Sequence, residues 1–372
     1  MHSPSFLLTV VAFVLLLGPL ILVHELGHYL VARWLGVKAE AFSIGFGKEI
    51  AGWSDRRGTR WKLSLLPLGG YVQFAGDMNP ASIPEALPAD MPPEQRAQLF
   101  QTRPVWQRAL IVLAGPATNF LLAVAIFAGF NVAYGKMVVT PEVSIVVAGS
   151  PAAMAGVRAG DRIVAIDGDP IGDFGQIRER VAPFPGHTVT LLVRRGATQL
   201  SLPMRIAESV EHDGFGNSAR IGRLGIAAGK ANVRFERVGP GEAVSLAFGQ
   251  TFGVMRMIVT GIRQIMIGER SVRELGGPLK IAQYSGEQLS LGWPEFVSFA
   301  ALISINLAFI NLLPIPALDG GHLVFYAAEA VRRKPVGARG QEWAFRTGLA
   351  FVLALMLFVT VNDLASLHLF GR

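Results

Sequence analysis

The sequence contains no cysteine, and charged residues are scarce. Asp, Glu, Lys and Arg make up 16% of its 372 residues, whereas an average soluble domain carries about 25%. The lack of cysteine excludes disulfide frameworks, zinc ribbons, iron–sulfur clusters and cysteine nucleophiles. Any metal must therefore be held by carboxylates and by the seven histidines. The low charge, together with 51% hydrophobic residues, points to a membrane protein rather than a soluble enzyme.

Basic residues exceed acidic ones, 34 Lys and Arg against 27 Asp and Glu, for a net charge of +7. They are spread along the chain without a basic run or an interleaved aromatic platform. We therefore expect no nucleic-acid partner and attribute the excess to membrane topology.

Long apolar segments predict about four transmembrane helices. We place them at residues 1–35, 105–135, 295–333 (with polar interruptions) and 343–366. A further segment, 241–268, is amphipathic and is expected to lie at the membrane interface. A fifth span is the alternative there, although Arg256 and Arg263 would make a lipid-facing span expensive.

The distribution of positive charge predicts the orientation. Lys and Arg are frequent after the first span and in the short link between the third and fourth spans. By the positive-inside rule both segments are cytoplasmic. Four spans then place both termini, and the long region between residues 136 and 295, on the outer side.

The cytoplasmic region 36–104 contains short apolar stretches separated by Gly and Pro, at 42–48 and 60–74. This pattern is typical of β-hairpins. Because these hairpins lie close to a predicted span, we expect them to lie on the membrane surface, where an exposed strand edge can pair with an extended peptide. A packed hairpin without a substrate role is the alternative. The stretch 78–93, rich in Pro and Ala, is predicted to be a mobile loop.

The outer region begins with a domain that we place at residues 138–228. It contains SPAAMAGVRAGDRIVAIDG at 150–168, a predicted helix at 174–181 and two predicted strands at 188–194 and 199–205. This order resembles a PDZ domain of the bacterial, circularly permuted kind. Its last strand is expected at 224–228, after a loop over 207–220. A PDZ groove implies a peptide C-terminus or a substrate as ligand. We expect residues 229–294 to be amphipathic and interfacial.

The motif that carries chemistry is His24-Glu-Leu-Gly-His28, inside the first apolar segment. Residues four apart share one helix face, so both imidazoles can bind one zinc ion, with Glu25 beside them to move a proton. Burying two His and one Glu in a bilayer costs several kcal/mol unless the groups are paired or bind something. The pattern therefore predicts a metal site within the membrane.

A catalytic zinc usually has three protein ligands plus water, so a third ligand must come from elsewhere. We predict Asp319, an intramembrane carboxylate between helix-breaking Pro and Gly residues. Asn306 and Asn311 precede it and are candidates for hydrogen bonds to an extended substrate. His322 is expected to be structural, with a fourth ligand or a partner of a ligand as the alternative.

Five motifs, HELGH, PLGGYV, GPATN, SINLAFINLLPIPALDGGH and the single PDZ signature, resemble the site-2 protease family of intramembrane zinc metalloproteases. Within that family they are similar to the bacterial branch of the regulator of sigma-E protease type. The resemblance covers nearly the whole chain. It implies an α-helical polytopic membrane protein with a membrane-associated β-hairpin region and an inserted α+β PDZ domain.

The resemblance also implies roles. His24, His28 and Asp319 match the zinc ligands, Glu25 matches the general base, and Asn306 and Asn311 match substrate-contacting positions. Asn119 of GPATN matches the polar residue of the second span, which we assign to substrate binding. The implied protein lies in the bacterial inner membrane, with the PDZ domain and both termini periplasmic. It cuts the transmembrane segment of a single-span protein, such as an anti-sigma factor, after a first cleavage by another protease.

Two departures from the family pattern are visible. Many relatives carry two PDZ domains in tandem whereas this chain has one, and Gly47-Lys48 stands where Gly-Pro is frequent. Two other functions stay open at this point: a PDZ-bearing membrane scaffold with an inactive metal site, and a zinc transporter. No inverted internal repeat of the transporter kind is visible in the sequence.

Overall fold

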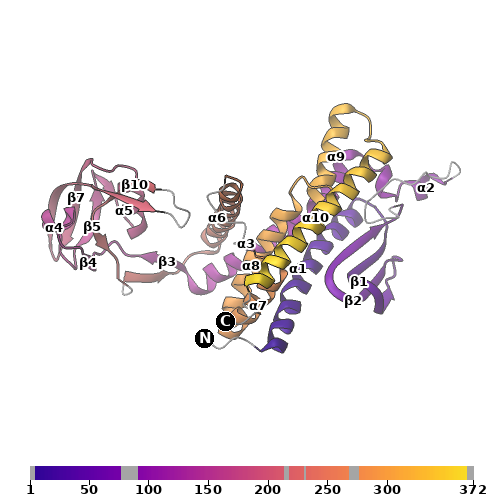
Figure 1. Cartoon of the computed structure of the whole chain (residues 1–372), viewed down its shortest axis with the longest axis horizontal. Helices are drawn as coiled ribbons and strands as arrows, with labels where there is room; N and C mark the ends of the chain where they lie inside the picture. The colour runs from indigo at the N-terminus through magenta and orange to yellow at the C-terminus, as the bar shows by residue number, and fades with distance from the viewer. Residues whose placement is uncertain (1–4, 77–90, 213–217, 230–231, 268–275, 367–372) are drawn as a thin grey trace. The chain divides into compact units, whose positions relative to one another are not determined.

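The computed structural model describes residues 5–76, 91–212, 218–229, 232–267 and 276–366 (Figure 1). It divides into two compact units. The first comprises Met1–Phe127, Ala247–Ile262 and Ser271–Arg372, and the second Ala128–Leu246 and Arg263–Arg270. Most of the loop expected over 78–93 lies outside the described residues.

Five helices in the described chain are long and apolar enough to cross a membrane, one more than the four predicted. They are α1 (Phe6–Trp34), α3 (Val105–Tyr134), α6 (Pro240–Met266), α8 (Trp293–Asn311) and α10 (Ala338–Ser366). The additional one is α6, which covers the amphipathic segment for which a fifth span was the alternative.

The single span predicted over 295–333 is wrong. The structure has α8, then a non-helical loop, then a second helix, α9 (Asp319–Arg332). The loop contains Pro314 and Pro316, and proline removes a backbone donor and clashes with the preceding turn of a helix. The break leaves Asp319 as the first residue of a new helix.

The region 229–294 contains a second helix that the sequence analysis did not identify, α7 (Pro278–Leu291). It packs against α1 and α8, and Figure 1 shows α1, α7, α8 and α10 alongside one another. Asp363 of α10 caps it, because the carboxylate accepts hydrogen bonds from the backbone N–H groups of Gly277 (3.0 Å) and Lys280 (3.1 Å). An apolar cluster that includes Leu16, Leu20, Phe296 and Ile303 fills the space between these helices.

Strands β1 (Ala39–Ser54) and β2 (Arg60–Phe74) form a curled sheet beside α1 (Figure 1). Both strands are long enough to pair twice. Residues 39–44 of β1 pair with 70–74 of β2 on one side and, over 41–44, with 60–63 of β2 on the other. Residues 49–54 of β1 then pair with the far side of 60–64. The segment 70–74 is therefore an edge, with a strand on one side only among the described residues.

The C-terminal end of α1, this sheet, α3 and α9 share one apolar core, whose buried members include Tyr29, Phe42, Phe74, Ile111 and Tyr326. Short helices α2 (Pro93–Arg96) and η1 (Phe100–Thr102) lead into α3. Arg108 of α3 also forms an ion pair with Glu329 of α9 at 2.6 Å. These contacts fix the helix that carries Asp319 against the helices that carry the rest of the site.

The second unit contains the inserted domain. Its secondary structure elements are β3 (Lys136–Val139), β4 (Ile145–Val146), α4 (Pro151–Met154), β5 (Arg162–Ile166), β6 (Asp169–Pro170), α5 (Phe174–Val181), β7 (Thr188–Arg195), β8 (Thr198–Arg205), β9 (Ala207–His212), β10 (Ser218–Arg223), β11 (Ile226–Ala227) and β12 (Val233–Glu236). The order β6-β5-β7-β8 forms the main sheet, and three further pairs are β9–β10, β4–β11 and β3–β12.

The helix expected over 174–181 is present as α5, and the two expected strands are β7 and β8. Inward side chains of β5, α5 and β7, among them Ile163, Ile177, Leu191 and Val193, form the core of the domain. The loop expected over 207–220 is wrong, because β9 and β10 pair there as a hairpin.

Candidate metal centre

His24 and His28 face the same side of α1, one turn apart, as the HELGH spacing predicts. Their Nε2 atoms are 3.2 Å apart. Oδ2 of Asp319, from the first turn of α9, lies 3.2 Å from Nε2 of His24 and 3.6 Å from Nε2 of His28. Three potential ligand atoms, from segments far apart in the sequence, thus meet at one point.

These distances fit a tetrahedral zinc site, in which ligand atoms at the usual zinc distances stand about 3.3 Å from one another. Nδ1 of His28 lies 2.9 Å from the backbone oxygen of Ile111, which can only accept, so Nδ1 carries the proton and Nε2 is bare. Oδ2 of Asp319 is buried and has no hydrogen-bond donor among the described residues. The lone pairs of Nε2 of His28 and Oδ2 of Asp319 therefore point to one place without a proton between them. A bound cation would satisfy both atoms.

Asn119, on α3, is completely buried beside His24. Its Nδ2 lies 3.3 Å from Nδ1 of His24, while its own Oδ1 is buried without a partner among the described residues. The two amide atoms are exchanged by a simple flip. With Oδ1 turned toward His24, it accepts the Nδ1 proton, which leaves Nε2 free to bind metal. Substrate binding by Asn119 stays a prediction.

Two glycines allow α1 and α3 to approach closely enough to build the site. A Cβ on Gly115 would lie 2.2 Å from Nε2 of His28 and 2.9 Å from Cε1 of His24. A Cβ on Gly27 would lie 2.5 Å from both the backbone oxygen of Ala114 and Oγ1 of Thr118. The glycines of HELGH and GPATN therefore allow the close packing of α1 and α3 that brings the polar residues of the same motifs together.

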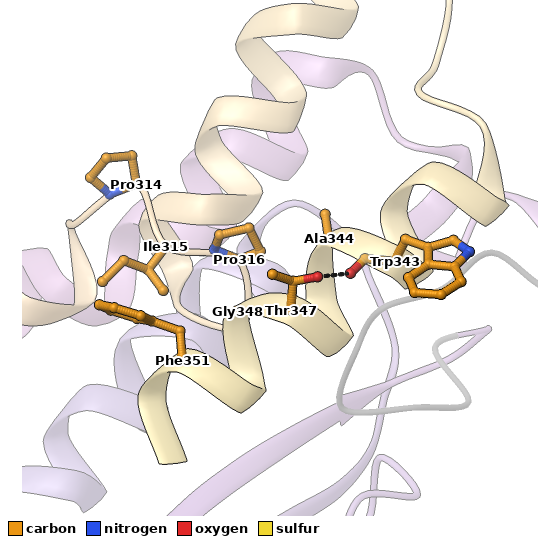
Figure 2. Close-up of a pocket in the computed structure, with 8 residues that line it drawn as sticks. All are labelled: Pro314, Ile315, Pro316, Trp343, Ala344, Thr347, Gly348 and Phe351. Carbon is orange, nitrogen blue, oxygen red and sulfur yellow. Dashed lines mark hydrogen bonds between the residues drawn. The ribbon is translucent and has the colours of Figure 1, made fainter. Parts of the chain in front are cut away.

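The loop that leads to Asp319 is packed equally tightly. A Cβ on Gly320 would lie 2.2 Å from the backbone oxygen of Leu313, and one on Gly321 would lie 2.4 Å from that of Ile315. On its other side the loop contacts α10, where Gly348 admits the backbone oxygen of Pro316. Figure 2 shows the apolar pocket of about 470 Å³ between them, which is lined by Pro314, Ile315, Pro316, Trp343, Ala344, Thr347, Gly348 and Phe351.

Glu25 lies between the metal ligands and the edge segment of β2. The backbone of Val72 hydrogen-bonds its carboxylate, and both histidines and Asp319 are close enough to act on its charge. A Cβ on Gly70 would lie 3.1 Å from Cγ of Glu25. The Gly-Gly pair of PLGGYV thus brings a free sheet edge to the glutamate.

Comparison with known families agrees with this geometry. The sequence profile of peptidase family M50 matches residues 12–355. The chain belongs to peptidase family M50. Membership of that family makes it a zinc metalloprotease, and its apolar helices make it a membrane protein.

Curated relatives of this M50 peptidase cover nearly the whole chain. A candidate zinc metalloprotease of Agrobacterium fabrum is 44% identical over 361 residues, with 96% of each chain covered. Metalloprotease MmpA of Caulobacter vibrioides is 36% identical over 384 residues, with 97% of this chain and 96% of that protein covered. Among solved structures, the PDZ domain of an SdrC-like protein from Listeria monocytogenes is 24% identical, covers 23% of this chain and 84% of that one, and gives a TM-score of 0.19.

The remaining predicted residues do not belong to the group of three converging side chains, His24, His28 and Asp319. Asn306 lies within α8 and Asn311 ends it, both half-buried, and neither contacts the ligands in the described chain through a hydrogen bond. His322, one turn along α9, contributes no atom to the ligand cluster and faces the ring of Tyr326 instead, with the ring centroids 6.5 Å apart. Substrate contacts by the two asparagines stay predictions.

Proposed function

We propose that this M50 peptidase hydrolyses a peptide bond inside the transmembrane segment of a single-span membrane protein. The observation that carries the proposal is the position of the metal centre along α1. This helix has 29 residues, about 43 Å at 1.5 Å per residue, which exceeds the hydrocarbon thickness of about 30 Å. His24 lies ten residues, about 15 Å, before the C-terminal end of α1. This depth supports a reaction within the bilayer.

Each polar side chain of the site has its own role in the proposed reaction. His24, His28 and Asp319 would hold a zinc ion, which when bound would supply a water of lowered pKa and polarise the scissile carbonyl. The Glu25 carboxylate stands beside these residues, where it can take a proton from the attacking water and deliver it to the leaving amine. Asn119 and Ile111 hold the histidines in the tautomer that leaves each Nε2 free.

The sheet edge at residues 70–74 is suited to hold an extended substrate. A helical substrate keeps its amides in the i to i−4 ladder, so the segment must unwind before attack. Because this edge has no strand on its outer side among the described residues and reaches Glu25 through Val72, an unwound segment that pairs with it lies beside the catalytic groups. Asn306 and Asn311 are proposed as further contacts to that segment.

We infer the biological setting from the family resemblance. The proposed substrate is a protein of the anti-sigma-factor type that another protease has already shortened, and the proposed site is the bacterial inner membrane. With four spanning helices and α6 lying along the membrane, the inserted domain and both termini are then periplasmic, and the groove of the inserted domain binds a peptide C-terminus or the substrate.

The test is cleavage of a model single-span substrate by the purified full-length protein reconstituted with zinc. Mass spectrometry of the products locates the cut bond. We expect a cut within the apolar segment by the wild type, and none by Glu25→Gln although that variant binds zinc equally. A cut confined to residues outside the apolar segment would contradict intramembrane proteolysis while leaving the metalloprotease intact. Equal cleavage by Glu25→Gln would overturn the role of Glu25.

A further inference from the structure

A two-stranded ribbon, β3 with β12, connects α3 and α6 to the inserted domain. Lys136 pairs with Glu236 and Met137 with Phe235 in the antiparallel register. Directly opposed residues of an antiparallel pair share a face. One face therefore carries only apolar side chains, those of Met137, Val139, Val233 and Phe235, and we call it the apolar ribbon face.

This face is exposed. Met137 is 62% exposed, Phe235 63% and Val233 38%, whereas Val138 on the opposite face is 7% exposed. Such an arrangement inverts the usual pattern, since a two-stranded ribbon in water normally turns its apolar side toward a core. Contiguous exposed apolar surface of this kind indicates an interaction site.

The ribbon begins at the end of a helix long and apolar enough to cross the membrane. Only Gly135 separates Tyr134, the last residue of α3, from β3. The backbone of Gly135 also lies close to β12, because a Cβ on Gly135 would be 2.4 Å from the backbone oxygen of Glu236. Met137 is therefore within about 10 Å of the helix end. The headgroup layer beyond the hydrocarbon core is roughly 5–8 Å thick on each side, so a ribbon that starts where α3 leaves the hydrocarbon core would lie at its depth.

Strand β12 is also held close to the C-terminal end of α3. Asn131 near the end of α3 donates a hydrogen bond to the backbone oxygen of Ala243 in the first turns of α6 at 3.2 Å, and α6 starts four residues after β12 ends. Both strands of the ribbon are thus rooted beside the same helix terminus, whether α6 spans the membrane or lies along it.

We propose that the apolar ribbon face lies in the lipid bilayer, at the boundary between headgroups and acyl chains. Phe130 and Tyr134 stack at 5.7 Å just before the ribbon, as aromatic residues of membrane interfaces do. Lys136 and Arg237, both exposed where the ribbon meets α3 and α6, complement the phosphates of anionic phospholipids. The occupant of this surface is lipid, and the ribbon is a membrane anchor.

The far end of the ribbon is fastened to the inserted domain. The backbone N–H of Val139 donates a 2.8 Å hydrogen bond to the carboxylate of Asp173, which also caps α5. The backbone N–H of Thr140 donates to the backbone oxygen of Asn232 at 2.8 Å. A ribbon held in the interface therefore fixes the height of the inserted domain above the bilayer. This anchoring is independent of the catalytic proposal.

The absence of native cysteine permits a direct depth measurement. Single variants Met137→Cys and Phe235→Cys, spin-labelled in the full-length protein, are reconstituted into vesicles of phosphatidylethanolamine and phosphatidylglycerol. Arg234→Cys, on the opposite ribbon face, is the matched control, and Leu121→Cys, an exposed position on α3, marks the bilayer. Collision rates with oxygen, which concentrates in lipid, and with a water-soluble nickel chelate are compared by electron paramagnetic resonance. Unchanged zinc content confirms that each labelled variant is folded.

We expect the ratio of oxygen to nickel collisions at positions 137 and 235 to be several-fold higher than at 234 and to approach that at 121. Nickel accessibility at 137 and 235 equal to that at 234 would place the ribbon in water and overturn the anchor. Protection of 137 and 235 from both reagents would show that protein covers the face, and would overturn it equally.

Discussion

A Cβ atom at position 115 would lie 2.2 Å from Nε2 of His28. The metal centre thus depends on a residue that contributes no side chain. Because the surrounding contacts are between helix backbones and imidazole rings, little can move to make room.

Gly115→Ala is expected to abolish stoichiometric zinc binding, since the added methyl group occupies the space of the ligand ring. Zinc per protein, measured by plasma mass spectrometry on purified protein, tests this. Gly129→Ala is the matched control, because it lies on the same helix and a Cβ there meets nothing within 4 Å. Full zinc content in Gly115→Ala would show that α1 and α3 separate easily, contrary to the packing described above.

Asn119→Leu is expected to weaken zinc binding by about 10–100-fold, the usual effect of removing a partner that orients a metal-bound histidine. Competition with a zinc chelator measures the affinity. Asn119→Asp retains an acceptor for the Nδ1 proton of His24 and is expected to bind zinc nearly as well as the wild type. If the leucine variant keeps its affinity, the amide does not set the tautomer of His24.

Gly348→Ala is expected to displace the loop that presents Asp319, since its Cβ would overlap the backbone oxygen of Pro316. Overpacking of this kind costs about 1–3 kcal/mol, so thermal stability and zinc affinity should fall together. Gly340→Ala, on the same helix, is the control, because its Cβ makes only an ordinary 3.5 Å contact with Val336. Equal behaviour of the two variants would refute the role of this contact.

The inserted domain is expected to lose stability in acid through Asp161. Hydrogen bonds from Arg195 and from the backbone of Arg158 hold the pKa of its carboxyl below the usual value. A carboxyl whose pKa is lower in the folded state stabilises that state above its unfolded pKa of about 3.9, and this contribution disappears as the pH falls through the folded pKa. Melting of the full-length protein at several pH values tests this.

Asp161→Asn is the informative comparison for that experiment. It should melt a few degrees lower than the wild type at neutral pH, and the difference should shrink on acidification below about pH 4. A difference that is independent of pH would assign the loss to packing rather than to the ion pair.

The convergence of His24, His28 and Asp319 was predictable from the sequence because its signals are local. The four-residue spacing of His24 and His28 places both rings on one helix face, and Asp319 is a carboxylate between helix-breaking residues in an apolar segment. The bounds of α5 were predictable for a similar reason, since a short amphipathic run lies between turn residues.

Features that depend on contacts between distant segments were not predictable. The role of Gly115 appears only when α3 is placed against α1, and that of Val72 only when β2 reaches Glu25. Helix α7 is stabilised by a cap from Asp363, 85 residues beyond its first residue, so its own sequence gives a weak signal. Pro314 and Pro316 account for the division of the expected 295–333 span into α8 and α9.

The order of the ligands along the chain has a consequence for biosynthesis. His24 and His28 leave the ribosome early, whereas Asp319 follows only after the inserted domain and α8. A nascent chain therefore carries two histidines and a glutamate in the membrane but no complete metal centre. The three side chains can meet only after α9 has packed against α3, so the centre is completed late in synthesis.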